Sequence, residues 1–174
     1  SEEKAELIRL QSVVITESQL NRIKNLCSRH LCSTTISTVF DLTTTDLPTA
    51  LDGVLAQVAA AIQDDKTIVV LSDRGVDNIH AAIPMLLAVG AIHNELTRSG
   101  QRMLVDLVCE TGEVWDVHHL ATLIGYSASA IHPYLALQAA GAVAGTRGAE
   151  DLTVAQAQKN YIASLEKGML KISS

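Results

Sequence analysis

The sequence predicts an α/β protein in which four successive βα units form a parallel, half-(β/α)8-barrel-like sheet behind an N-terminal helix. Short β-branched or aliphatic runs alternate four times with longer segments whose apolar residues recur at helical spacing. Such alternation favours parallel strands joined by right-handed crossovers. Hydrophobic residues make up 48% of the chain and aromatic residues only 3%, which predicts an aliphatic core. An open four-stranded α/β sheet is the alternative that the pattern does not separate from a half barrel.

The first third of the chain predicts helix, strand and helix. Thr16 is a suitable cap for the first helix, because its side chain can accept a hydrogen bond from a free backbone amide. Residues 33–42 (STTISTVFDL) are β-branched and aromatic, as expected of a strand. A second helix opens at Asp46 and Pro48, where an aspartate cap and an early proline are tolerated. Its apolar face is expected to carry Leu51, Val54, Leu55, Val58 and Ile62.

The middle of the chain predicts two further strand–helix pairs. Residues 67–71 (TIVVL) are mainly aliphatic on both alternating faces, as in a strand that is covered on both sides. A helix follows, with Pro84 near its start and Gly100 as its left-handed stop. Residues 103–109 form the third predicted strand, and residues 116–125 form a short helix that begins with an aspartate cap.

The last part of the chain predicts a short fourth strand and two helices. The strand covers residues 129–131, and a helical segment runs from residue 135 to about residue 143. A small, polar loop (GTRGAED) follows. Thr153 and Gln156 then have the spacing of a capping box, which opens a last helix that is expected to end near Glu166.

The length of 174 residues suits a single domain over 1–174. We expect it to divide into a helical lead-in (1–30), the βα units (33–150) and a C-terminal helix (151–174). Charged residues make up only 18% of the chain, and its mean hydropathy is +0.23. This balance predicts that part of the surface faces another part of a protein.

Charge and hydropathy argue against several classes of partner. A net charge of −6 and a pI near 5.4 disfavour nucleic acid, whose binding depends on lysine and arginine. No apolar run reaches the roughly 18 residues that span a bilayer, and the acidic start (SEEKAELIRL) is unlike a signal peptide. Three cysteines are too few for a disulfide framework, so a reducing cytoplasm or plastid is the expected location.

Polar side chains gather where the predicted strands end. In parallel α/β folds the carboxyl ends of the strands share one edge, and ligands or partners meet that edge. We therefore select these residues as the candidate site. They are Ser72, Asp73, Arg74, Gly75, Glu110, Thr111, Gly112, Glu113, His118, His119, His132, Pro133 and Tyr134.

One interpretation of these residues is a metal or acid/base centre built from Asp73, Glu110 and the histidines. Mixed histidine and carboxylate sites do bind transition metals. The spacing contains neither H-E-x-x-H nor C-x-x-C, however. His118 and His119 are neighbours on a helix and point about 100° apart, so they do not easily share one ion. The alternative is that the strand-end residues cap helices, pair with each other or contact a partner.

The cysteines and the DRG sequence are also weak signals. Cys27, Cys32 and Cys109 lack the tight spacing of iron–sulfur ligands, so buried structural cysteines are the expected interpretation. Asp73 and Arg74 have no glycine-rich phosphate loop beside them, which favours a structural ion pair. We therefore expect no catalytic, cofactor-binding or metal-binding residue in this chain.

Several segments together resemble the central domain of the glutamate synthase large subunit. The strings L-S-D-R-G, E-x-G-E-x-x-x-V-H-H and P-Y-L-A are specific in combination, and the similarity covers nearly the whole chain. In chain order the segments are SVVITESQL (12–20), STVFDL (37–42), LSDRGVDNIHAAIPMLLAVGAIHNEL (71–96), LVCETGEVWDVHHLATLIGY (107–126), HPYLAL (132–137) and NYIASLEKGMLKI (160–172).

The resemblance implies a place within a larger enzyme. In that family an amidotransferase domain with an N-terminal cysteine nucleophile precedes the central domain, and an FMN-binding barrel with a [3Fe-4S] cluster follows it. The enzyme converts glutamine and 2-oxoglutarate into two glutamates, with electrons from ferredoxin or NAD(P)H, and ammonia crosses an internal tunnel. The resemblance implies that this chain is a non-catalytic connecting domain, that its partners are the amidotransferase and FMN domains, and that the strand-end residues are candidate interdomain contacts.

Two other functions are weighed beside this one. The first is a free-standing α/β ligand-binding or metal-dependent enzyme domain that uses Asp73, Glu110 and His132. The second is a self-associating half barrel, in which two copies close the exposed edges of their sheets.

Overall fold

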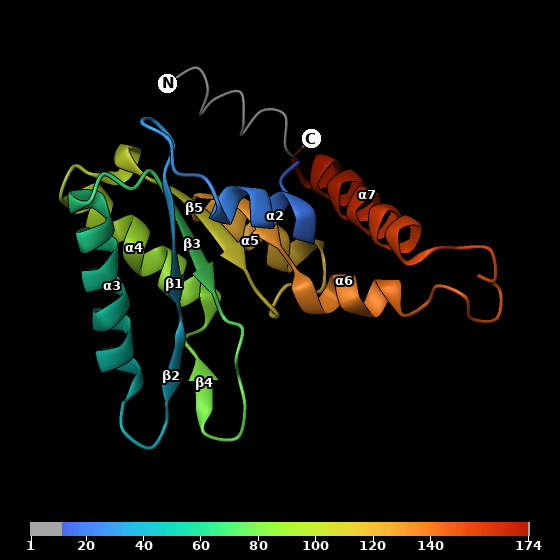
Figure 1. Ribbon diagram of the computed structural model, residues 1–174, viewed down its shortest axis with the longest axis horizontal. Coiled ribbons are helices and arrows are strands. Elements are labelled where there is room, and N and C mark those ends of the chain that lie inside the picture. The colour runs from blue at the N-terminus through green and yellow to red at the C-terminus, as the bar shows by residue number, and fades with distance from the viewer. Residues whose placement is uncertain (1–11, 174) are drawn as a thin grey trace.

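The computed structural model describes residues 12–173, and a parallel sheet of four strands forms its centre (Figure 1). The order of the sheet is β1-β3-β5-β6, so each of these strands pairs with the next one along the chain. The predicted α/β class, with alternating βα units and an N-terminal helix, is therefore confirmed. The strands are β1 (Ser33–Ser37), β3 (Ile68–Ser72), β5 (Asp106–Glu110) and β6 (Ala128–His132).

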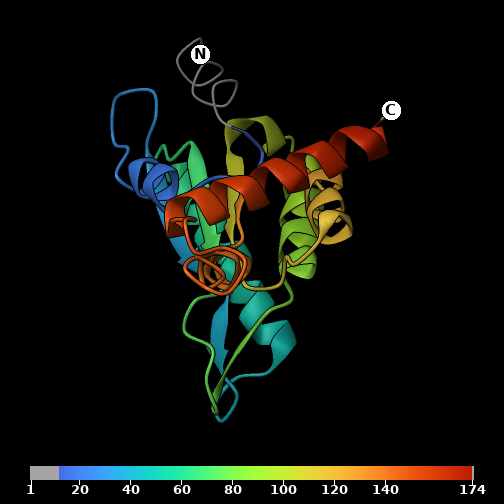
Figure 2. The same cartoon turned by 90° about the vertical axis from the view of Figure 1, so that its right-hand side faces the viewer.

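Helices cover both faces of this sheet (Figures 1 and 2). Helix α2 lies on one face, and α3, α4 and α5 lie on the other, while α7 crosses beside α5 and α6. The helices are α2 (Glu17–Lys24), α3 (Leu47–Gln63), α4 (Met85–Arg98), α5 (Val117–Gly125), α6 (Tyr134–Gly141) and α7 (Val154–Ser173). No helix within the described residues is both long and apolar enough to cross a bilayer.

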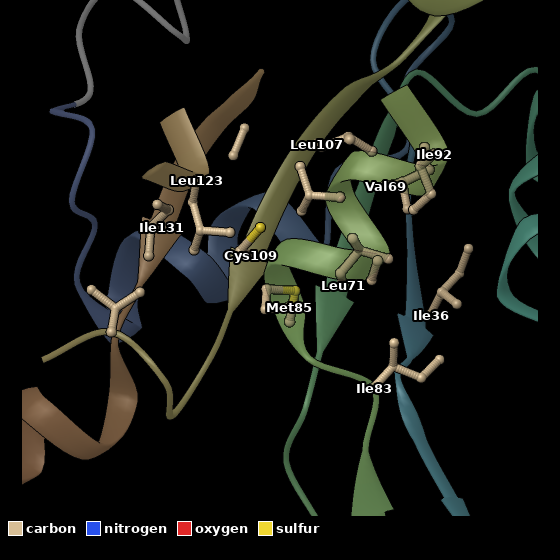
Figure 3. Packing of buried hydrophobic residues seen from close by; sticks show 14 of the residues in the cluster. Ile36, Val69, Leu71, Ile83, Met85, Ile92, Leu107, Cys109, Leu123 and Ile131 are labelled. Carbon is tan, nitrogen blue, oxygen red and sulfur yellow. The ribbon is translucent and has the colours of Figure 1, made fainter. Parts of the chain in front are cut away.

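The alternation of side chains along the strands divides the core into two parts. Leu71, Leu107 and Cys109 point to the larger part, where they pack with Met85 of α4 (Figure 3). The residues next to them in each strand, such as Val70 and Val108, point to the other face of the sheet and pack under α2. The smaller part contains Ile15, Leu20, Ile23, Leu31, Ile68, Val70, Val108 and Ala130.

Three helix starts form as the sequence predicts. Thr16 and Gln19 make a capping box at α2, in which the Thr16 hydroxyl accepts a hydrogen bond from the Gln19 backbone amide at 3.2 Å. Asp46 accepts from the Thr49 amide at the start of α3, and Asp116 caps α5 in the same way. These caps are local interactions, so the sequence alone is enough to predict them.

The predicted strand 33–42 is in fact two strands. β1 ends at Ser37, and β2 (Val39–Asp41) pairs antiparallel with β4 (His80–Ala82) in a separate ribbon that extends beyond the sheet (Figure 1). Thr38 lies between them and is buried, with its amide donating to the Ser72 carbonyl at 2.9 Å. The prediction missed β4 because three residues are too few to show a periodic pattern.

Two other predicted boundaries also differ. The expected strand 103–109 begins only at residue 106, because Arg102–Leu104 form a 3-10 turn with Met103 exposed. The last helix continues through Gly168 to Ser173 instead of ending near Glu166. A Cβ at Gly168 would lie 2.4 Å from Val117 Cγ2, so this glycine allows α7 and α5 to pack closely.

The edge of β6 is not open, contrary to the expectation of exposed sheet edges. Val14 forms a parallel bridge with Ile131. The Ile15 amide donates to the Ile131 carbonyl at 2.9 Å, and the Ile131 amide donates to the Val13 carbonyl at 2.8 Å. Residues 1–11 of the expected helical lead-in lie outside the described residues.

Candidate functional site

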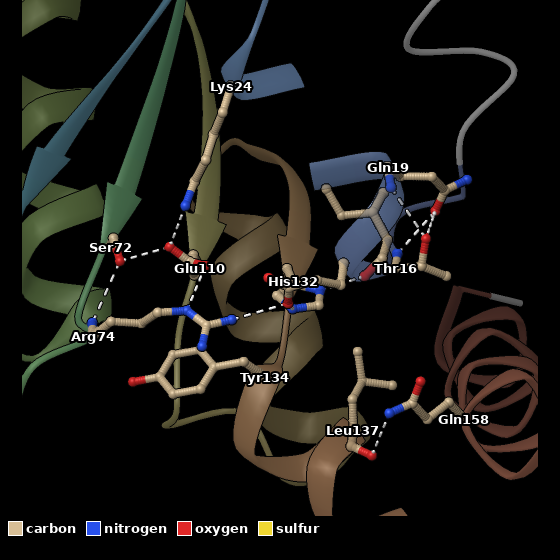
Figure 4. Close-up of polar contacts among 12 residues, drawn as sticks. Thr16, Gln19, Lys24, Ser72, Arg74, Glu110, His132, Tyr134, Leu137 and Gln158 are labelled. Atoms are coloured by element: carbon tan, nitrogen blue, oxygen red, sulfur yellow. Dashed lines mark hydrogen bonds and ion pairs between the residues drawn. The ribbon is translucent and has the colours of Figure 1, made fainter. Parts of the chain in front are cut away.

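A buried carboxylate at the end of β5 is the centre of the strand-end site. Only 1% of Glu110 is exposed, and it accepts hydrogen bonds from Lys24 Nζ at 2.9 Å, Ser72 Oγ at 2.7 Å and Arg74 Nε at 2.6 Å (Figure 4). Burial alone would raise the pKa of Glu110, but these three hydrogen bonds outweigh burial and hold the pKa below its usual value. Glu110 is therefore an ion-paired anchor, and both of its oxygens are engaged.

Arg74 connects Glu110 to the N-terminal helix and to α6. Its second nitrogen, Nη2, donates to Glu17 Oε2 at 3.0 Å, across 57 positions of the chain. Its guanidinium also lies over the Tyr134 ring, 4.2 Å from the ring centroid, which is the geometry of a cation–π contact (Figure 4). One side chain thus joins three elements.

His132 ties the end of β6 to the residues around the start of α2. It is 2% exposed, and its Nδ1 lies 2.8 Å from the Ile15 carbonyl oxygen. Its Nε2 lies 2.8 Å from Glu17 Oε2. A carbonyl oxygen only accepts, so Nδ1 carries a proton and donates to Ile15. The ring is therefore engaged on both sides.

Asp73 forms a second buried centre next to the first. It is 2% exposed and accepts from Thr111 Oγ1 and the Tyr134 hydroxyl at 2.6 Å each, and from the Gly112 amide at 3.0 Å. Burial and the bond to Asp73 raise the pKa of Tyr134, so this hydroxyl stays protonated as a donor. A Cβ at Gly112 would lie 2.6 Å from Leu135 Cδ1, so a larger residue here would require the Leu135 side chain to move.

Glu113 joins the second centre through its backbone, whose amide donates to Thr111 Oγ1 at 3.1 Å, but its side chain extends to α4. Glu113 Oε2 accepts from the Met85 amide at 2.7 Å and so caps α4, whose N-cap Pro84 provides no side-chain bond. Burial raises the pKa of Glu113, although the Met85 amide acts against it. His119 Nδ1 accepts from the Trp115 amide at 3.1 Å. Both side chains line a small cavity of about 160 Å³ between α4 and α5.

The structure thus brings together most of the predicted site, and it adds two residues. Ser72, Asp73, Arg74, Glu110, Thr111, Gly112, His132 and Tyr134 form one connected network. Pro133 is buried at the start of α6. Gly75 follows in an exposed loop with φ +103°, and His118 is exposed on α5.

The two added residues are Glu17 and Lys24 of α2. They lie three residues before and four residues after Leu20, so they flank the buried stripe of the helix, with the Lys24 side chain 29% exposed and the Glu17 side chain 58% exposed. Charged residues in an apolar stripe were the signal that could have identified them.

A cleft of about 320 Å³ opens beside the network, and its polar side chains are mostly bonded to each other. Glu17, Arg74, His132 and Tyr134 line one side, and Gln138 and Gln158 line the other. Within residues 12–173, no three His, Cys, Asp or Glu side chains are grouped so that they could hold a metal ion. The arrangement is suited to holding elements in place.

The sequence was also compared with known proteins. It matches the family described as glutamate synthase central domain over residues 1–174. It is 37% identical to ferredoxin-dependent glutamate synthase 2 of Synechocystis, over 99% of this chain and 12% of that protein. It is 36% identical to the chloroplastic ferredoxin-dependent glutamate synthase of rice, over 99% of this chain and 11% of that protein. It is 34% identical to the glutamate synthase [NADPH] large chain of Bacillus subtilis, over 100% of this chain and 11% of that protein.

Proposed function

This chain belongs to the glutamate synthase central domain family, and on that premise we propose that it is the non-catalytic connecting domain of a glutamate synthase. It links the amidotransferase and FMN domains of one polypeptide and helps to frame the ammonia tunnel between them. The full enzyme turns glutamine and 2-oxoglutarate into two glutamates, in the cytoplasm or a plastid. The chain spans only 11% to 12% of the relatives named above, so these roles of the whole protein are part of the proposal.

The observation that carries the proposal is that the strand-end network is satisfied from within the chain. Glu110 and Asp73 each have three partners, and His132 has two. A catalytic carboxylate needs a lone pair or proton that can reach a substrate. These side chains instead fix the loops after β3, β5 and β6, which makes this edge a rigid surface for a neighbouring domain.

We expect exposed apolar side chains at the same end of the molecule to supply the contact with a neighbouring domain. Leu86, Leu87, Trp115 and Leu135 are each 39% to 49% exposed. All four lie in the segments that follow β4, β5 or β6, so they share the end of the molecule that carries the network. We call them the strand-end apolar surface. Gathered apolar side chains beside a rigid polar base are typical of an interaction site.

The other two functions weighed above have less support. An enzyme that uses Asp73, Glu110 and His132 would have to break the bonds that hold them. Self-association through open sheet edges is disfavoured at β6, because residues 13–15 already pair with that strand.

The three cysteines of this chain do not fit the implied [3Fe-4S] cluster, and the proposal assigns both FMN and the cluster to other parts of the full-length enzyme. Cys27 and Cys32 lie together, but Cys109 is packed in the core with Leu71 and Ile131. A three-iron cluster requires thiolates that face one site. No step of catalysis is therefore assigned to these residues.

The proposal is tested in the glutamate synthase polypeptide that carries this chain. Leu87→Asp places a charge on the strand-end apolar surface, and Met103→Asp is the matched control at the opposite edge, where Met103 is 91% exposed. We expect Leu87→Asp to release glutamine-derived ammonia to solvent and to lower the glutamate formed per glutamine hydrolysed. Met103→Asp should retain the wild-type ratio. An unchanged ratio in Leu87→Asp, or tight FMN binding or glutaminase turnover by residues 1–174 alone, would reject the proposal.

A further inference from the structure

The segment between α2 and β1 brings two cysteines into a paired position. The backbones of Cys27 and Cys32 pair as an isolated antiparallel β-bridge. The Ser28 amide donates to the Leu31 carbonyl at 2.8 Å, and the Ser33 amide donates to the Leu26 carbonyl at 3.0 Å. These two bonds flank the cysteines, so Cys27 and Cys32 themselves are a non-hydrogen-bonded pair, the kind in which facing side chains lie closest.

This backbone pairing has the geometry that a disulfide requires. In a non-hydrogen-bonded pair the Cα atoms lie about 4.5 Å apart, which is within the range of roughly 4.4–6.8 Å found across disulfides. Both residues are free thiols, and their sulfurs are in contact at 2.6 Å. A bond between them therefore requires no movement of the backbone.

The two thiols differ in access and in charge. Cys27 is exposed, whereas Cys32 is 9% exposed and lies 3.3 Å from the Lys66 ammonium. The hydrogen bond from Cys27, together with Lys66, lowers the pKa of Cys32, and the bond to Cys32 raises the pKa of Cys27. The third thiol, Cys109, is buried in the core, and burial raises its pKa to about 12. Reactive thiol character is thus confined to the pair.

We propose that Cys27 and Cys32 are a reversible dithiol–disulfide site that exchanges with low-molecular-weight disulfides. Cys27, the accessible sulfur, bonds to one sulfur of the disulfide RSSR and expels the first RSH. Cys32, as the thiolate beside Lys66, then bonds to the Cys27 sulfur and expels the second RSH. Two electrons pass from the cysteines to RSSR, the Cys27 proton leaves with the first RSH, and the second RS⁻ takes its proton from water.

The site lies where it can influence the strand-end network. Ser33 Oγ, next to Cys32, donates to the Ile23 carbonyl at 2.7 Å and to the Lys24 carbonyl at 3.0 Å, so the pair sits against the C-terminal turn of α2. Lys24 of that turn binds Glu110. Oxidation therefore fixes the segment from which Lys24 reaches the sheet. The inference does not depend on the proposed function.

Peptide mapping tests the site directly in the folded polypeptide that carries residues 1–174. The protein is exposed to glutathione disulfide, alkylated and digested with trypsin without reduction. Cleavage after Lys24, Arg29 and Lys66 places Cys27 on peptide 25–29 and Cys32 on peptide 30–66. We expect the two peptides to remain linked, with no glutathione retained, and to separate when a thiol reductant is added.

Variants assign the role of each sulfur. Cys32→Ser should retain glutathione on peptide 25–29, Cys27→Ser should react little, and Cys109→Ser should match the wild type. Lys66→Met should slow the linking several-fold, with peptide 30–74 replacing 30–66, and Lys66→Arg should restore the rate. Unlinked wild-type peptides, whether free or carrying glutathione, would overturn the proposal. This wild-type result decides the matter even if a variant fails to fold.

Discussion

Glu110 and Asp73 are buried carboxylates at the ends of neighbouring strands, Glu110 as the last residue of β5 and Asp73 directly after β3, yet they are held by different kinds of donor. Glu110 takes two cations, Lys24 and Arg74, and Lys24 comes from a helix 86 positions away in the chain. Asp73 accepts hydrogen bonds from the Thr111 hydroxyl and the Gly112 backbone amide of the loop after β5, and from the Tyr134 hydroxyl of α6. The Asp73 amide even donates to the Glu110 carbonyl at 3.1 Å. The difference teaches that the ionic centre ties helix α2 to the sheet, whereas the neutral centre ties the loops after β3 and β5 to the start of α6.

Removing the ionic centre should have the largest effect. Glu110→Ala leaves two cations without their buried partner, so we expect a loss of about 3–5 kcal/mol in the free energy of unfolding. Urea titration of the chain measures this loss. Glu95→Ala is the control, because Glu95 pairs with Arg98 at the surface and should lose less than about 1 kcal/mol. Equal losses in the two variants would show that Glu110 is not an anchor.

Weakening the neutral centre should have a smaller effect. Asp73→Asn retains the shape of the side chain, but its amide nitrogen cannot accept the hydrogen bonds now made to one oxygen. We expect a loss of about 1–3 kcal/mol in the free energy of unfolding. The same titration measures it. A loss greater than that of Glu110→Ala would reverse the comparison between the two centres.

A single donor to the neutral centre should contribute less again. Tyr134→Phe keeps the ring beneath Arg74 and removes only the hydroxyl that donates to Asp73. The expected loss is about 1 kcal/mol. Tyr161→Phe is the matched variant, because its hydroxyl donates to the Trp115 carbonyl at an exposed position. If Tyr161→Phe lowers the free energy of unfolding as much as Tyr134→Phe does, burial of Asp73 does not strengthen its hydrogen bond with the Tyr134 hydroxyl.

The smallest effect should appear on the acid side of the stability profile. The folded-state pKa of Glu110 is lowered, so its stabilisation is present above its unfolded value, about 4.3, and is lost as pH falls through the folded value. The folded pKa of Glu113 is raised, so its contribution has the opposite sign and is lost as pH rises through that value. Urea titrations between pH 3 and pH 6 should show a shallower acid-side loss in Glu110→Gln and a steeper one in Glu113→Gln. If both variants lose stability with falling pH at the same slope as the wild type, both predicted directions are wrong.

Features set by neighbouring residues could be predicted from the sequence. The caps at Thr16, Asp46 and Asp116, and the buried strand that contains Val69 and Val70, depend on side chains within a few positions. The strand-end grouping followed from the geometry of parallel sheets.

Features set by distant residues could not be predicted. The Lys24–Glu110 pair depends on which face of the sheet α2 covers. The order of strands and helices in the sequence does not predict that face. The β2–β4 ribbon joins two three-residue segments that show no alternation. The sequence placed the end of the last helix near Glu166, because the contact that Gly168 makes with Val117 lies 51 positions away.

Helix α2 has a consequence for building larger proteins from this one. It covers the sheet face opposite to α3, α4 and α5, which in an eightfold barrel would become the interior. That interior has room for layers of side chains and no more. A head-to-tail fusion of two copies would therefore close into a barrel only after residues 12–26 were removed and new side chains replaced the support of Leu20 and Ile23. Helix α2 already covers the sheet face that further βα units would have to enclose.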